Sequence, residues 1–208
     1  MRGVSLSTAE RWAAGVAVVV LLLHASGFGD ALEYRRAFLA HEPWRLLTGH
    51  LVHINWPHAT INAAALLIVA RLFAPDLSAP RQMVILLSAS LMISLGLAAL
   101  APGILWYRGL SGVLHALFFA GAAKWLLSVQ QRTVRALWLP AALFVGGWIK
   151  ITLEQPAGDA LPYADWLGAA VVPQAHLIGA ACGSAFGLVL ALADRRSREQ
   201  HAEKEQRQ

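Results

Sequence analysis

The sequence is poor in charge, because Asp, Glu, Lys and Arg make up only 14% of its 208 residues, where a soluble domain carries about 25%. Hydrophobic residues reach 57%, and the mean hydropathy is +0.53. A water-soluble globule could not cover its surface with so few charges, which excludes a soluble enzyme and a disordered chain. The single cysteine, Cys182, excludes an internal disulfide and a cysteine-rich metal site. The composition therefore predicts a membrane protein that crosses the bilayer several times.

Six stretches are long and apolar enough to span a hydrocarbon core about 30 Å thick. They are about Trp12–Phe28, Pro57–Phe73, Met83–Leu100, Ser111–Val129, Val134–Leu153 and Val172–Ala193. The sequence predicts an all-α polytopic membrane protein, with a six-helix transmembrane domain over residues 1–193 and a charged cytoplasmic tail over 194–208 that extends the last helix. The first stretch also resembles a cleaved signal peptide, but five remaining spans would then put the basic tail outside.

The basic residues are distributed unequally between the two ends of the expected spans. With both termini in the cytoplasm, 12 of the 17 basic residues lie inside, and the acidic residues divide equally. This distribution follows the positive-inside rule, so we expect both termini to be cytoplasmic. The pI near 10.0 then reflects basic residues at the membrane edges and does not indicate nucleic-acid binding. The longest outer loops, about Gly29–Trp56 and Glu154–Val171, are where function is expected.

A short motif, Gly109-Leu110-Ser111-Gly112, stands where the fourth stretch begins. If Lys124 marks the inner interface, a rise of about 1.5 Å per residue puts Ser111 in the outer half of the bilayer or at its edge. Polar groups so placed are costly and often mark function. A serine near a helix start can also simply cap or bond to the backbone, so this motif alone does not establish a nucleophile.

Two faces of small residues predict close packing of the fourth and sixth stretches, because spacings of three and four return to one side of a helix. This packing would bring His176 toward Ser111, where an imidazole can accept the serine proton and return it to a leaving amine. A structural histidine bonded to a carbonyl is the alternative. The two faces are His176, Gly179, Gly183 and Gly187 in the sixth stretch and Gly112, Ala116 and Ala120 in the fourth.

His115 follows Ser111 by four residues, and on a helix its side chain leans back toward the serine. It could be the base, stack on His176 or only pack. We expect it to stack.

Four polar side chains, His50, His53, His58 and Asn62, cluster around the start of the second stretch. Pro57 suits the first turn of a helix, which puts His58 and Asn62 on one face near the outer surface. Two neutral donors there could hold an oxyanion as it forms. Clustered histidines could instead bind Zn²⁺, but their spacing matches no zinc signature, and we expect no metal.

Together these residues resemble the rhomboid family of intramembrane serine proteases, and the resemblance covers nearly the whole six-span core. Four motifs carry it in the family's order. They are the nucleophile motif at Gly109–Gly112, the base motif at Ala175-His176 with Gly179 and Gly183, the H-x-x-x-N of His58–Asn62 preceded by His53, and the E-x-W-R of Glu42, Trp44 and Arg45 in the first outer loop.

The resemblance implies a six-helix rhomboid-like bundle and a Ser111–His176 dyad without an acidic third member. It implies an oxyanion hole formed by His58, Asn62 and the Ser111 backbone N–H. The family usually has a tyrosine stacked on the base where His115 stands here. The implied partners are single-span membrane protein substrates and membrane lipid, and neither a cofactor nor nucleic acid is expected.

The short chain and the string GLSGVLH resemble the rhombosortase branch of this family. Those proteins are bacterial inner-membrane proteases, paired with proteins that carry a C-terminal glycine-rich motif, one span and a basic tail. Two other classes stay open at this point. One is a catalytically inactive rhomboid-like protein that binds or escorts membrane clients, and the other is a haem or metal carrier that uses the clustered histidines.

Overall fold

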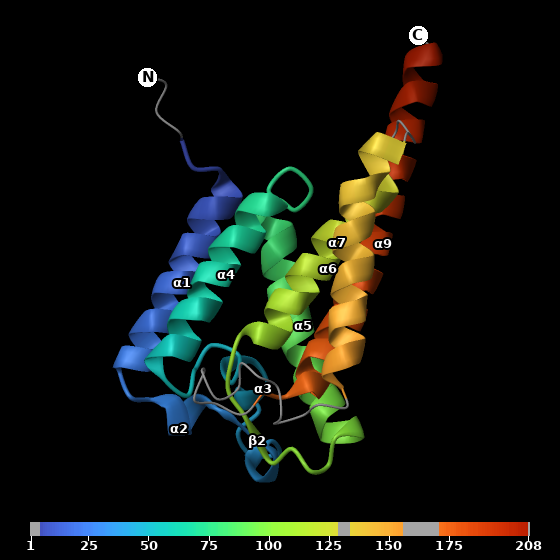
Figure 1. Ribbon diagram of the computed structural model, residues 1–208. Helices are drawn as coiled ribbons and strands as arrows, with labels where there is room; N and C mark the ends of the chain where they lie inside the picture. Colours follow the sequence, from blue (N-terminus) through green and yellow to red (C-terminus); the bar gives the residue numbers. More distant parts are fainter. Residues whose placement is uncertain (1–4, 129–133, 156–170, 208) are drawn as a thin grey trace.

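The computed structural model describes residues 5–128, 134–155 and 171–207, and six long helices dominate that part of the chain. They form one bundle, with the start of the first helix and the end of the last at the same side (Figure 1). The helices are α1 (Thr8–Ala25), α4 (Trp56–Leu72), α5 (Ala79–Leu100), α6 (Ser111–Ser128), α7 (Val134–Glu154) and α9 (Pro173–Gln206). The prediction of an all-α polytopic bundle is confirmed.

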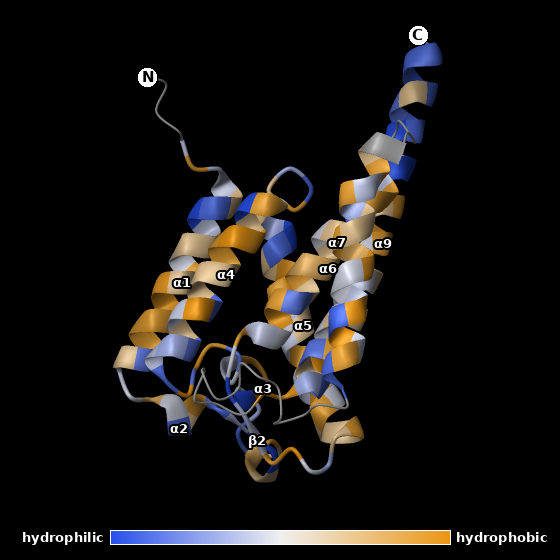
Figure 2. Ribbon diagram, in the orientation of Figure 1, coloured by the Kyte–Doolittle hydropathy of each residue, from blue (hydrophilic) through white to orange (hydrophobic). Residues whose placement is uncertain are grey.

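The exterior of the bundle suits a lipid environment. Five helices are long and apolar enough to cross a membrane, namely α1, α5, α6, α7 and α9. The sixth, α4, has 17 residues, about 26 Å at 1.5 Å per residue, and packs beside α1 and α6. Figure 2 shows apolar residues along the middle of the helices and hydrophilic residues gathered at the ends.

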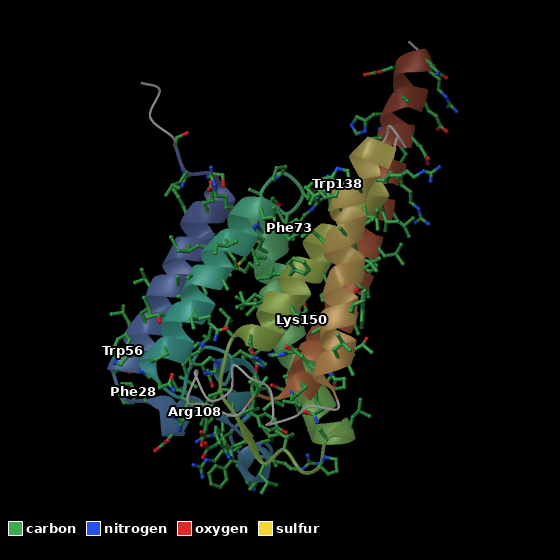
Figure 3. The ribbon with its side chains drawn as sticks, viewed as in Figure 1. Phe28, Trp56, Phe73, Arg108, Trp138 and Lys150 are labelled. Carbon is green, nitrogen blue, oxygen red and sulfur yellow. The ribbon has the colours of Figure 1, made fainter. Side chains whose placement is uncertain are left out.

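Exposed aromatic side chains mark both ends of the bundle. Trp56 is 52% exposed at the end where α4 begins, and Trp138 is 58% exposed at the opposite end of α7. Figure 3 shows the two indole rings at these two levels. Tryptophan is enriched at both interfaces of a bilayer, where its ring has one apolar and one polar partner, so the two residues outline the hydrophobic thickness.

Several helix ends differ from the sequence prediction. α1 begins at Thr8 because Ser7 caps it: the Ser7 hydroxyl accepts from the Glu10 N–H, and the Glu10 carboxylate accepts from the Ser7 N–H at 2.7 Å. α5 begins at Ala79, four residues early. α9, in contrast, continues through the tail to Gln206 as expected, about 51 Å in all.

Parts of the predicted organisation lie outside the described residues. They are Val129 at the end of the fourth expected span, most of the last outer loop (156–170), and Arg2 and Arg132 of the charge count.

α6 is the central helix, with 61% of its apolar window buried, and α9 packs along it more closely than a side chain would allow. A Cβ added to Gly179 would lie 2.1 Å from the Gly112 carbonyl oxygen, and one added to Gly183 would lie 2.2 Å from that of Ala116. Only glycine fits at such an approach. The small-residue faces therefore meet, and they align the N-terminal ends of α6 and α9.

The end of the bundle away from the chain termini is closed by the segment between α1 and α4 and by the loop before α6. This region holds α2 (Gly29–Leu32), β1 (Tyr34–Arg35), the 3₁₀ helix η1 (Arg36–Phe38), α3 (Arg45–Thr48) and β2 (Trp106–Tyr107). β1 and β2 pair antiparallel, with Tyr34 opposite Tyr107. Figure 1 shows these elements at the end away from the termini. The pairing ties the first loop to the residues that lead into α6.

The end of the bundle near the chain termini carries a buried ion network. Lys124 of α6 lies 3.5 Å from Asp76 and 3.1 Å from Asp194 of α9, and Asp194 also pairs with Arg81 of α5. The Lys124 side chain is only 7% exposed. A buried ammonium needs such partners, so this network joins three helices at the end opposite Ser111.

Candidate active site

The start of α6 has a backbone conformation that requires glycine. Gly109 has φ +133°, and a Cβ there would lie 2.8 Å from the His58 ring. Its N–H donates to the Gly49 carbonyl at 3.1 Å, and its carbonyl accepts from the Tyr107 hydroxyl at 2.7 Å. These contacts hold the turn that makes Ser111 the first residue of the helix.

The Leu110 N–H donates to Nε2 of His53 at 3.3 Å. Burial, aided by the neighbouring His58 and His24 rings, lowers the pKa of His53 to about 3. The ring is therefore neutral at physiological pH, so Nε2 can act as an acceptor. His53 thus serves as a support for the turn before Ser111.

Ser111 and His176 are in hydrogen-bond contact. The distance from Ser111 Oγ to His176 Nε2 is 2.9 Å, across 65 residues of sequence. Ser111 is half-buried, and His176 is 5% exposed. Both lie near the N-terminal ends of their helices, one turn or less from the contact of Gly179 with Gly112. A serine and an imidazole at this distance have the geometry of an activated nucleophile and its base.

A carboxylate lies on the other side of the same imidazole. Oε2 of Glu154, the last residue of α7, is 3.1 Å from His176 Nδ1, and its Oε1 accepts from Lys150 Nζ at 2.6 Å. The resemblance implied no acidic third member, whereas the structure places a carboxylate from the end of α7 in contact with His176.

His115 stacks on His176, with ring centroids 4.3 Å apart and planes inclined by 27°. Its Nδ1 is 2.8 Å from the Ser111 carbonyl oxygen, and its Nε2 is 3.2 Å from Lys150 Nζ. A carbonyl only accepts and an ammonium only donates, so Nδ1 carries the proton and Nε2 is an acceptor. His115 therefore contacts the backbone of Ser111, whereas His176 contacts its hydroxyl.

His58 and Asn62 occupy the first two turns of α4 on the face toward α6. The Asn62 side chain is 4% exposed, and its amide donates to the His58 carbonyl at 2.9 Å. A carboxamide has two N–H groups, so this bond leaves a second donor. Asn62 and Ser111 line the same cavity, while the His58 ring packs against Gly109 and edge-on against His53.

The motif residues Glu42, Trp44 and Arg45 lie in the segment between α1 and α4, and Arg45 helps to hold this segment together. Arg45 is 5% exposed; it pairs with Glu42, and its Nη1 donates to the carbonyls of Asp30 and Glu33 at 2.9 and 2.8 Å. Trp44 is 49% exposed. Arg45 therefore joins two turns of the loop, and Trp44 points outward.

An apolar cavity of about 530 Å³ opens beside Ser111 between α4, α6 and α7. Polar side chains line its end near Ser111, and aliphatic, aromatic and glycine residues line the rest. Figure 3 shows Lys150 toward the end of α7 that lies away from the chain termini. The lining residues are Asn62, Ala65, Val69, Ser111, Leu114, His115, Phe118, Phe119, Ala142, Leu143, Gly146, Gly147 and Lys150.

His115, Glu154 and His176 are also a set of donors that Zn²⁺ accepts, and their ligand atoms lie within 4.8 Å of one another. The ammonium of Lys150 contacts two of the three. Lys150 thus already provides a positive charge to this cluster. The histidines considered as metal ligands from sequence are elsewhere, and His50 bonds to Ser94 at 3.0 Å.

The fold and site define a class: a helical, multi-pass membrane protein in which a serine and a histidine from two tightly packed helices meet beside an apolar cavity. The Rhomboid domain family model matches residues 40–193, most of the chain, and the protein belongs to the rhomboid family. Members of this family are generally serine intramembrane proteases that act on membrane proteins. No curated protein matches the sequence. The rhomboid part of the sequence interpretation is confirmed, and the rhombosortase branch stays a prediction.

Proposed function

We propose that this protein is an intramembrane serine endopeptidase, in which Ser111 is the nucleophile and His176 the general base. The observation that supports the proposal most directly is the 2.9 Å contact between Ser111 Oγ and His176 Nε2. The family supplies the reaction class, and the cavity beside the serine supplies a place for an apolar segment.

In the proposed reaction His176 Nε2 accepts the hydroxyl proton as Ser111 Oγ bonds to the substrate carbonyl carbon, and the carbonyl electrons move onto oxygen. The Asn62 amide, the His58 ring and the Ser111 N–H would stabilise this oxyanion. The C–N bond then breaks, and Nε2 returns the proton to the leaving amine. Water repeats the sequence on the acyl-enzyme and releases Ser111.

The proposed substrate is a single-span membrane protein, cleaved in or next to its membrane segment. A helical peptide bond has its carbonyl engaged in backbone bonding, so the segment must unwind near its outer end before Ser111 can attack. The cavity is open beside α4 and α7, which suits lateral access from lipid. For the rhombosortase branch, the substrate would carry a C-terminal glycine-rich motif before its span.

The proposed setting is the bacterial inner membrane, with both termini in the cytoplasm and Ser111 near the outer face. The positive-inside charge distribution supports this orientation. The tail beyond Ala193 would then extend α9 into the cytoplasm as a charged helix.

The test is labelling with a fluorophosphonate probe in detergent, which requires no known substrate. Native protein should label, Ser111→Ala should abolish the label, and His176→Ala should weaken it. Ser184→Ala is the matched control, since this half-buried serine of α9 donates only to the Ala180 carbonyl at 2.8 Å among the bonds described, and it should label normally. Label that survives Ser111→Ala, or folded native protein that never labels, would overturn the proposal. The second result would favour a client-binding role.

The substrate class requires a second measurement. A reporter with one C-terminal span should be cleaved when a glycine-rich motif precedes the span, and a matched reporter with alanine in place of the glycines should not. Equal cleavage of both would reject the rhombosortase assignment while retaining the protease.

A further inference from the structure

Glu154 is a buried carboxylate between a histidine and a lysine. Its side chain is 4% exposed, whereas that of Lys150 is 51% exposed. A carboxylate taken out of water is costly unless it is paired and hydrogen-bonded. Lys150 and His176 supply these partners, one on each oxygen.

A side-chain hydrogen bond between the end of α7 and the start of α9 helps to hold Glu154 in place. The side-chain amide of the next residue, Gln155, donates to the Ile151 carbonyl and to the Pro173 carbonyl, both at 3.1 Å. Pro173 is the first residue of α9, three before His176. The end of α7 is thereby held against the start of the helix that carries the base.

The contact determines which nitrogen of His176 holds the proton. An ionised carboxylate is only an acceptor, so Nδ1 facing Glu154 must be protonated. In the neutral ring Nε2 is then unprotonated and can accept from the Ser111 hydroxyl. The opposite tautomer would present an N–H to Ser111 and could not act as its base.

We propose that Glu154 is a positioning residue, which holds His176 in the tautomer and orientation required for proton transfer and is itself held by Lys150. This inference deepens the proposed function and rests on it. The group completes a Ser111–His176–Glu154 arrangement of the type in which a buried acid orients the base and faces the imidazolium once it forms. Glu154 itself transfers no proton.

The charged and titratable groups around His176 agree with this role. Within the described residues these are His115 and Ser111 of α6, Glu154 and Lys150 of α7, and His58 of α4. Glu154 is the only carboxylate among them. The Lys150 ammonium bonds to both Glu154 and His115, so one cation orders the acid and the stacked ring together.

The contact with Lys150 allows Glu154→Gln to test which tautomer of His176 the acid selects. The ammonium only donates, so the glutamine oxygen must face Lys150, which turns the NH₂ group toward His176 Nδ1. That donor selects the unproductive tautomer. Glu154→Gln should therefore slow fluorophosphonate labelling by roughly 10²–10⁴-fold, as loss of the orienting acid does in serine proteases. Glu154→Asp, which keeps the carboxylate, should recover most of the rate.

A double variant separates this account from a general packing role. In Glu154→Gln/Lys150→Met the amide is free to turn its oxygen toward Nδ1, so labelling should be faster than in Glu154→Gln alone. Thermal unfolding of each variant verifies folding. Labelling of Glu154→Gln within threefold of native, or a double variant slower than Glu154→Gln, would overturn the proposal.

Nitrogen NMR of histidine-labelled protein in nanodiscs provides a readout that does not depend on activity. His176, assigned by comparison with His176→Ala, should show a protonated Nδ1 in native protein and a protonated Nε2 in Glu154→Gln. This switch in a protein that never labels would leave the role of Glu154 intact and refute the protease proposal. A native protein that labels but carries the proton on Nε2 would refute the role of Glu154 alone.

Discussion

Replacing Gly179 by alanine should separate α9 from α6 and disconnect the serine from its base. The added Cβ would lie 2.1 Å from the Gly112 carbonyl oxygen, whereas ordinary contact begins at 3.4 Å. The helices must therefore part by about 1.3 Å at this level. A similar shift in the 2.9 Å contact between Ser111 and His176 takes it beyond hydrogen-bond range.

Two magnitudes follow for Gly179→Ala. Overpacking of a close helix contact costs about 1–3 kcal/mol of stability. A misplacement of about 1 Å in a reacting pair can cost roughly 10²-fold in rate. Both effects are measurable on one sample, by thermal unfolding in detergent and by the rate of fluorophosphonate labelling.

The control is Gly15→Ala in the middle of α1, where an added Cβ meets nothing within 4 Å. That substitution should label at the native rate and be neutral or stabilising by up to about 1 kcal/mol, because alanine favours a helix over glycine. Native labelling by Gly179→Ala would refute the argument that this glycine contact aligns the site.

Three further predictions concern separate parts of the molecule. Asn62→Ala should slow labelling and cleavage by about 10²–10³-fold, the effect of losing one oxyanion donor, with little change in thermal unfolding; an unchanged rate would remove Asn62 from the oxyanion group. Lys124→Met should lower the free energy of unfolding by about 3 kcal/mol, the low end for breaking a buried ion pair, because the Asp76 side chain is still 19% exposed. Labelling of the folded fraction should stay normal, and a native melting temperature would contradict the prediction. Gly109→Ala should abolish labelling, since the residue has φ +133° and its Cβ would meet the His58 ring; normal labelling would show that the turn can rearrange.

The small-residue pattern of the fourth and sixth stretches carried much of the structural prediction. Glycines recur every four residues in the sixth stretch, and small residues recur at the same interval in the fourth. Close contact between these two helices is the simplest interpretation of the pattern. Once those faces meet, helical geometry brings His176 toward Ser111 without further information. The order of the motifs similarly placed Asn62 and Ser111 on the same side of the bundle.

Glu154 shows what the same reasoning missed. Hydropathy ends the fifth span at Leu153 and puts Glu154 at the start of a loop, so neither Glu154 nor Lys150 is predicted as a site residue. Their spacing of four on an apolar helix was the available signal, because ionisable residues inside a span generally mark function. Which helix would face His176 depends on how α7 leans on α6 and α9, and no local pattern encodes that angle.

The boundaries that differed have similar causes. Ser7 and Glu10 form a reciprocal cap, so α1 begins before its apolar run. A prediction from hydropathy alone starts the helix later, at the first apolar residues. The continuation of α9 to Gln206 agrees with the expected helical extension, because the tail is rich in strong helix formers.

α7 carries the acid that faces the base, yet it is the least embedded of the five long apolar helices, with 11% of its window buried. It also forms one wall of the cavity beside Ser111 through Gly146 and Gly147. A chain seated in that cavity would therefore lie against the same helix that presents Glu154 to the imidazole. One helix thus serves both as a wall of the cavity and as the support of the carboxylate beside His176.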